Sequence, residues 1–99
     1  MVREQGKRFR TTHLEVRFIA SLLRGPRIGI IVPKYGRNSV DRNRLKRRLR
    51  DIIRQTVLPY MPALDVVFRT RPSAYQAEFA DLQEQCKSLR QRVVEGVGS

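Results

Sequence analysis

Residues 38–58 read NSVDRNRLKRRLRDIIRQTVL, and this stretch decides how the chain folds. Its apolar residues recur at intervals that place them on one side of an α-helix: Leu45, Leu49, Ile52, Ile53 and Val57. Asn38 can cap this helix, and Asp41 suits its positive N-terminal end. Pro59 should stop it near Leu58. The pattern predicts an amphipathic helix with its apolar stripe on a protein core.

The rest of this helix is strongly basic. Residues 34–54 contain nine Lys and Arg residues against two acids, a balance of +7 within a formal net charge of +12. Seventeen of the 21 bases of the chain are Arg, whose guanidinium group binds phosphate in a bidentate manner. Charge concentrated on one element favours binding of a polyanion. The candidate nucleic-acid-binding residues are Lys34, Arg37, Arg42, Asn43, Arg44, Lys46, Arg47, Arg50 and Arg54.

The flanking segments have the pattern of strands. Apolar and polar residues alternate over 12–22, with Leu14, Val16 and Phe18 on the core side. A β-branched run follows at 27–32 after a Gly-Pro turn, and we expect these two strands to form an antiparallel hairpin. A third strand is predicted over 63–71. Residues 1–11 show no clear period and are expected to be irregular.

A second helix should begin between residues 73 and 78, with Ser73 and Gln76 as a capping box. Its predicted apolar stripe is Tyr75, Phe79, Leu82, Cys86, Leu89 and Val93. The tail 96–99 is expected to fray. With no repeat or linker, the chain is predicted to be one domain over 1–99, ordered from about 7 to 95.

Residues that could carry out catalysis are scarce. The chain has one His and one Cys, which excludes a His/Cys metal cluster, and no glycine-rich phosphate loop occurs. We expect no catalytic residue, no metal ligand and no tightly bound cofactor. Cys86 is predicted to be a buried thiol, and its isolation fits a reducing cytoplasm. No apolar run reaches the ~18 residues of a membrane span.

The basic helix should therefore carry the function, and nucleic-acid binding is the preferred interpretation. A solvated surface helix would mix signs more evenly, and a membrane-bound helix would not lie between strands. A DNA-reading helix usually follows another helix rather than a strand. A ribosomal or chaperone-like RNA-binding domain without a role in tRNA processing stays open as an alternative.

The string Arg42-Asn43-Arg44-Leu45-Lys46-Arg47, followed by Arg50, resembles the RNR signature of the bacterial ribonuclease P protein subunit. Its neighbours agree in order and spacing. The run RIGIIVPK at 27–34 is similar to the family's strand before the motif, and DVVFRTRP at 65–72 is similar to the strand after it. The resemblance covers residues 6–94.

This resemblance implies an α/β domain, an α+β sandwich. It has a small mixed sheet, the RNR helix as a left-handed βαβ crossover, and a C-terminal helix packed on the sheet. It also implies a protein that binds the ribonuclease P RNA subunit through Arg42, Asn43, Arg44, Lys46, Arg47 and Arg50. In that family the catalytic RNA, with Mg²⁺, removes the 5′ leader of precursor tRNA.

The resemblance further implies a cleft on the sheet that holds the single-stranded leader. Its candidate residues are His13, Glu15, Arg17, Arg69 and Arg71. Family members usually begin with a helix that forms one wall of this cleft. Here Gly6-Lys7-Arg8-Phe9 resembles the family's segment just after that helix, so most of the helix is missing from this sequence. Arg17 occupies a strand position where the family often has an aromatic residue, which predicts contact with leader phosphates rather than stacking.

Overall fold

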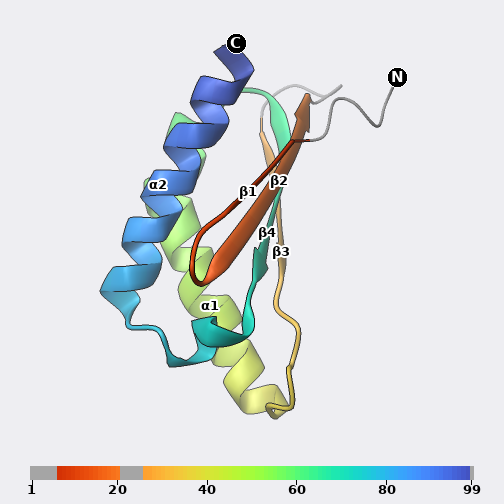
Figure 1. Ribbon diagram of the computed structural model, residues 1–99, viewed down its shortest axis with the longest axis vertical. Helices are drawn as coiled ribbons and strands as arrows, with labels where there is room; N and C mark the ends of the chain where they lie inside the picture. The colour runs from red at the N-terminus through yellow and green to blue at the C-terminus, as the bar shows by residue number, and fades with distance from the viewer. Residues whose placement is uncertain (1–6, 21–25, 99) are drawn as a thin grey trace.

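The computed structural model describes residues 7–20 and 26–98, which form a four-stranded mixed sheet with two helices on one side (Figure 1). The strands are β1 (Lys7–Arg10), β2 (Leu14–Ala20), β3 (Arg27–Ile31) and β4 (Leu64–Thr70). The helices are α1 (Ser39–Thr56) and α2 (Phe79–Gly98), and the short 3-10 helices are η2 (Leu58–Tyr60) and η3 (Pro72–Gln76). No described element covers the other side of the sheet.

The predicted hairpin is wrong, because β2 and β3 are not neighbours. The strand order is β1-β2-β4-β3, with β4 antiparallel to β2 and parallel to β3. The sequence of β4 explains its central place: Val66 and Phe68 are buried on one side, and Val67 is half-buried on the other. A strand that is apolar on both sides suits the middle of a sheet. Local patterns predicted β2, β3 and β4 but could not predict which strands pair.

Helix α1 connects the parallel strands β3 and β4, as the resemblance implied. Because β3 and β4 are parallel neighbours, α1 is the crossover of a βαβ unit, and it lies with α2 on one side of the sheet (Figure 1). The expected crossover helix between two parallel strands is confirmed.

The chain's N-terminal segment was expected to be irregular, but residues 7–10 form β1. This strand pairs with β2 from Lys7 opposite Phe18 to Arg10 opposite Glu15. Phe9 is the apolar residue of the strand, and its ring stacks on that of Phe18 with centroids 5.8 Å apart. Four residues with one apolar side chain cannot show a period, so the strand was not visible in the sequence.

The α1 prediction is confirmed in its bounds, cap and orientation. Asn38 is the N-cap, and its side-chain oxygen accepts a hydrogen bond from the Asp41 backbone amide at 2.8 Å. All five residues of the predicted apolar stripe are buried. At the other end, the Arg90 guanidinium donates to the Thr56 carbonyl at 2.7 Å and lies over the Tyr60 ring. Because the last carbonyls of a helix lack partners within it, Arg90 ties α1 to α2.

Helix α2 begins later than predicted. Ser73 lies in η3, where its hydroxyl donates to the Thr12 carbonyl at 3.0 Å, so it does not cap α2. The helix starts at Phe79, which is 47% exposed, and its four next stripe residues are fully buried. It extends to Gly98, so residues 96–98 of the predicted frayed tail are helical. Pro72 causes the difference, because the 3-10 turn it starts uses residues 72–76.

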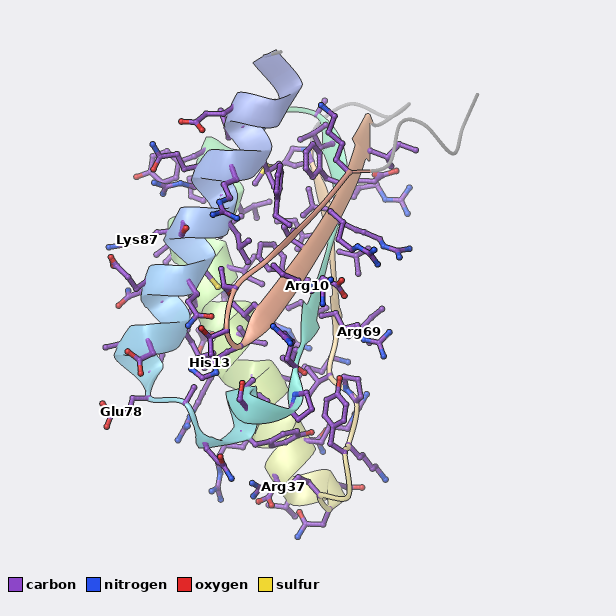
Figure 2. All side chains as sticks on the ribbon, viewed as in Figure 1. Arg10, His13, Arg37, Arg69, Glu78 and Lys87 are labelled. Atoms are coloured by element: carbon purple, nitrogen blue, oxygen red, sulfur yellow. The ribbon has the colours of Figure 1, made fainter. Side chains whose placement is uncertain are left out.

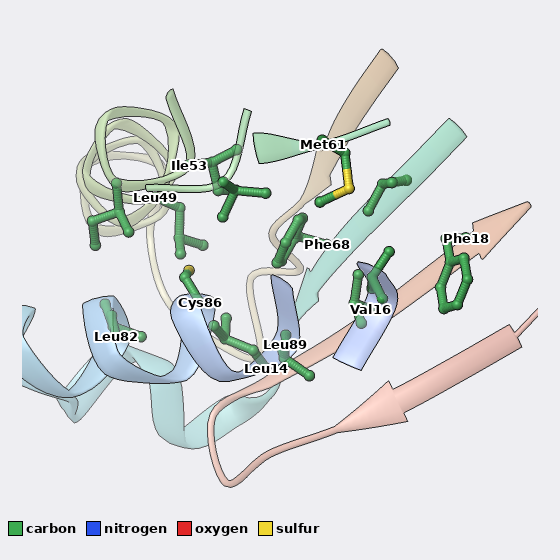
Figure 3. Packing of buried hydrophobic residues seen from close by; sticks show 14 of the residues in the cluster. Leu14, Val16, Phe18, Leu49, Ile53, Met61, Phe68, Leu82, Cys86 and Leu89 are labelled. Atoms are coloured by element: carbon green, nitrogen blue, oxygen red, sulfur yellow. The ribbon is translucent and has the colours of Figure 1, made fainter. Parts of the chain in front are cut away.

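The core lies between the sheet and both helices (Figure 3). Leu14, Val16 and Phe68 approach it from the sheet, Leu49 comes from α1, and Cys86 comes from α2. All five side chains have no exposed surface. The predicted buried thiol is confirmed.

We expect Cys86 to resist alkylation in the folded protein. Desolvation raises the pKa of its thiol to about 12, so the reactive thiolate forms in the unfolded chain first. Iodoacetamide at pH 8.5 should label native protein far more slowly than protein in urea, as mass spectrometry can measure. Because the folded pKa is raised, folding stability should fall as the pH rises above the ordinary thiol pKa of about 8.5. Equal labelling rates would contradict burial.

Candidate nucleic-acid interface

The basic surface of α1 separates from its apolar stripe as predicted. Asn43, Arg44, Arg47 and Arg50 are exposed, and Lys46 is half-buried at the edge. Apart from a 3.5 Å contact between Arg42 and the Asn43 side chain, no hydrogen bond or ion pair with described residues engages this group. Four of these five side chains are cationic, so their charges are available to an anionic partner. We call these five residues the α1 basic face.

Three other candidates already have partners within the protein. The Arg42 Nε donates to the Val32 carbonyl at 2.9 Å, which ties the first turn of α1 to the chain just after β3. The guanidinium of Arg37, which is labelled in Figure 2, lies 3.9 Å from an Asp41 carboxylate oxygen and 5.1 Å from the centre of the Tyr75 ring. Arg54 pairs with an Asp51 oxygen at 2.7 Å. Arg42 thus has an anchoring role that the sequence did not reveal, while Arg37 and Arg54 keep exposed surface.

The Tyr75 side chain connects this region to η3. Its hydroxyl donates to the Pro33 carbonyl at 2.7 Å. Burial raises the pKa of this phenol, while the positive charges of Arg42 and Arg37 act in the opposite direction. Tyr75 therefore remains protonated at neutral pH and holds the chain that enters α1.

A residue missing from the candidates is Arg48. It lines a hollow of about 160 Å³ near the start of α1, with Arg37, Arg44 and Tyr75 around it. Arg44 and Arg48 are four residues apart, so they lie on the same side of the helix. Their position next to the RNR residues could have been found from the helical spacing alone. The basic surface of α1 consequently extends toward η3.

The sheet side opposite the helices, which we call the open face, carries the second candidate region. A hollow of about 260 Å³ is lined by Glu15, Arg17, Ile31, Val67 and Arg69. The strand register brings them together: Glu15 lies opposite Arg69, and Arg17 lies opposite Val67. The hollow thus has an apolar floor and two exposed guanidinium groups. The predicted residues Glu15, Arg17 and Arg69 do form one site.

The other two predicted cleft residues lie elsewhere. His13 precedes β2, and its ring nitrogen Nδ1 is 2.7 Å from the Ser73 hydroxyl on the helix side of the sheet (Figure 2). Arg71 follows β4, and its guanidinium donates to the Thr11 carbonyl at 3.0 Å. Strand alternation stops at the strand ends, so extending it by one residue misplaced both side chains.

Strand β1 adds residues to the open face that the sequence analysis did not include. Arg8 lies opposite Arg17, and its Nε is 3.5 Å from a Glu15 carboxylate oxygen. Arg10 lies opposite Glu15 and is exposed. The sequence offered no signal for them, because β1 is too short to show a period. With these residues, Arg8, Arg10, Arg17 and Arg69 lie on the strands around Glu15, and this part of the open face is net positive.

Two negative findings concern residues 7–20 and 26–98. Neither helix there has the length and hydrophobicity that a membrane crossing requires. The same residues bring together no group of three or more His, Cys, Asp or Glu side chains suited to a metal ion.

Comparison with known proteins decides the family. The Ribonuclease P family profile matches residues 1–94. The chain belongs to the ribonuclease P protein family. The ribonuclease P protein component of Syntrophobacter fumaroxidans is 38% identical over 90 residues, covering 89% of this chain and 75% of the relative. The ribonuclease P protein component of a Cyanothece species is 37% identical, and the match covers 89% of this chain and 80% of that relative.

A solved structure agrees with the observed fold. The ribonuclease P protein from Thermotoga maritima, in complex with 1-(4-fluorophenyl)-2-thiourea, superposes with a TM-score of 0.76 at 26% identity. The superposition covers 92% of this chain and 89% of the Thermotoga maritima chain. The ribonuclease P family assignment and the fold together make this chain a protein subunit of an endoribonuclease of tRNA processing, with an RNA partner. The comparisons offer no support for the ribosomal or chaperone-like alternative.

Proposed function

We propose that the α1 basic face binds the ribonuclease P RNA subunit while the open face holds the 5′ leader of precursor tRNA. The observation that carries this proposal is the placement of two separate positive surfaces. One consists of unpaired side chains on α1, and the other is a hollow between strands. Both present guanidinium groups, which match phosphate oxygens. Lys34, Arg37, Arg42 and Arg54 contribute at the margins of the α1 surface.

Under this proposal the catalytic centre belongs to the RNA, which hydrolyses the precursor with Mg²⁺ in the cytoplasm. The protein contributes binding: its charged groups on both surfaces are suited to phosphates rather than to a divalent cation. By neutralising phosphates near the junction of RNA subunit and substrate, it should lower the Mg²⁺ concentration that cleavage requires.

Reconstitution tests the proposal directly. Purified protein added to a bacterial ribonuclease P RNA should increase cleavage of precursor tRNA at low Mg²⁺. The RNA alone serves as the baseline. Correctly folded protein that binds this RNA yet leaves cleavage unchanged would contradict the proposal.

The open face makes a separate prediction about the leader. Arg17→Gln combined with Arg69→Gln should weaken binding of precursor tRNA to the holoenzyme by roughly 10-fold, because two charge-assisted contacts are lost. Binding of mature tRNA, which has no leader, should not change. Fluorescence anisotropy with both labelled tRNAs measures the difference.

The matched control removes two positive charges from α2. Lys87→Gln with Arg92→Gln has the same change in net charge but lies on the opposite side of the sheet. It should leave the preference for precursor over mature tRNA intact. If both double variants reduce precursor binding equally, the effect is one of overall charge and the open face is not the leader site.

A further inference from the structure

We infer that the hollow between β3 and α1 receives the base of one unpaired nucleotide of the RNA subunit. This inference rests on the proposed function of the α1 basic face and specifies the kind of RNA element bound there. The hollow measures about 270 Å³. It is lined by Ile28, Ile30, Arg50, Ile53, Arg54 and Leu58.

The composition of this hollow separates it from a purely electrostatic surface. Its apolar walls come from β3, from α1 and from η2. Leu58 is 38% exposed, and Ile28 and Ile30 are only partly buried although they pack against the core. Exposed apolar groups that line one concave site favour an apolar ligand.

Two guanidinium groups stand on the rim of this apolar hollow. Arg50 is exposed and has no described partner, and Arg54 is exposed while paired with Asp51. A ligand that is apolar and flat at one end and anionic at the other would satisfy both parts. A nucleotide has this chemistry, with its base facing the aliphatic walls and its flanking phosphates facing the two Arg side chains.

The nucleotide must be unpaired for its base to enter. In an RNA duplex the bases are stacked inside, and the surface consists of phosphates and 2′-hydroxyl groups. Such a surface would leave the isoleucines and Leu58 against solvated groups. A looped-out base has an exposed face that apolar side chains can cover, as protein pockets for extruded bases do.

The edge position of β3 adds polar groups beside the hollow. In the strand order β1-β2-β4-β3, only β4 pairs with β3 among the described strands. Backbone groups along its outer edge can therefore exchange water for hydrogen bonds to RNA that lies beside the hollow. The site thus combines apolar cover with phosphate contact, next to a strand edge open to polar groups.

The test uses Leu58→Gln in the full chain with a bacterial ribonuclease P RNA. Affinity should fall roughly 10-fold from the loss of partial leucine burial. The slope of log K against log salt should not change, because no charge is removed. Leu58→Met should bind like the unchanged protein. Phe79→Gln is the matched control, because Phe79 is a similarly exposed apolar residue at the far end of the molecule, where α2 begins.

A second measurement includes a step that uses only the unchanged protein. Dimethyl sulfate should show an unpaired adenine or cytosine of the RNA that is protected by the unchanged protein and reactive with Leu58→Gln. Replacing that nucleotide by an abasic one should weaken binding of the unchanged protein roughly 10-fold. The same abasic RNA should not weaken binding of the Leu58→Gln protein any further, because the two changes remove the same contact between the base and Leu58.

Three outcomes would overturn the inference. The first is Leu58→Gln binding as tightly as the unchanged protein, and the second is protection confined to paired regions. The third is a loss of self-association by Leu58→Gln in sedimentation, with unchanged RNA affinity, which would assign the hollow to a second copy of the chain. Failure of the proposed function is separable, because Arg47→Ala combined with Arg50→Ala would then leave the salt slope unaltered.

Discussion

Replacement of Leu49 by alanine is expected to lower the free energy of unfolding by about 2–5 kcal/mol. Leu49 has no exposed surface and lies in the core between α1, the sheet and α2. Removing its branched end discards buried apolar contacts and leaves a cavity that close-packed neighbours fill only partly. Because a domain of this size is stable by roughly 5–15 kcal/mol, the loss is a large share of the total. Urea denaturation followed by circular dichroism measures it.

The adjacent residue provides the control for this stability loss. Arg50→Ala changes the next position of the same helix, but Arg50 is exposed and makes no described hydrogen bond. It should change the free energy of unfolding by no more than about 0.5 kcal/mol. Similar unfolding midpoints for the two variants would contradict the orientation of α1.

The second large effect concerns RNA affinity. Arg47→Ala combined with Arg50→Ala should weaken binding to ribonuclease P RNA by ~1–3 kcal/mol, because two guanidinium groups of the α1 basic face lose their phosphates. The slope of log K against log salt should become shallower by about 1.5–2, since about two fewer counterions are released. Filter binding at several salt concentrations measures both quantities.

The matched control for this pair is again Lys87→Ala with Arg92→Ala on α2. Its net charge change is the same, so any general effect of charge on long-range attraction should appear in both proteins. Only the α1 pair should alter the slope by the amount expected for direct contacts. A slope that stays the same in the α1 variant would place the RNA contact elsewhere.

The sequence alone was sufficient to predict the helices and strands that show periodicity or capping within a few residues. Helix α1 was predicted with its cap at Asn38 and its buried stripe, because side chains three and four apart share one face whatever surrounds the helix. The alternation of β2 and β4 likewise predicted which side of each strand faces the core. The RNR string and its neighbours predicted the family, which the family profile confirms.

Signals weaken at the ends of elements, and the errors occurred there. Strand β1 contains too few apolar residues to show a period, and the turn at Pro72 moved the start of α2. His13 and Arg71 were assigned to the open face by extending an alternation beyond its strand. His13, Arg71 and Ser73 each make a hydrogen bond to a distant segment, which local periodicity does not reveal.

What the sequence by itself determined is the amphipathic helix, the faces of its strands and the membership in an RNA-binding family. Only the tertiary structure decided that β4 lies between β2 and β3, that Arg42 anchors α1 while its neighbours stay exposed, and that Arg50 lies above an apolar hollow. The physical reason is distance along the chain. Periodicity and capping act within a few residues, whereas strand order and the partners of a side chain depend on contacts between segments that the sequence separates.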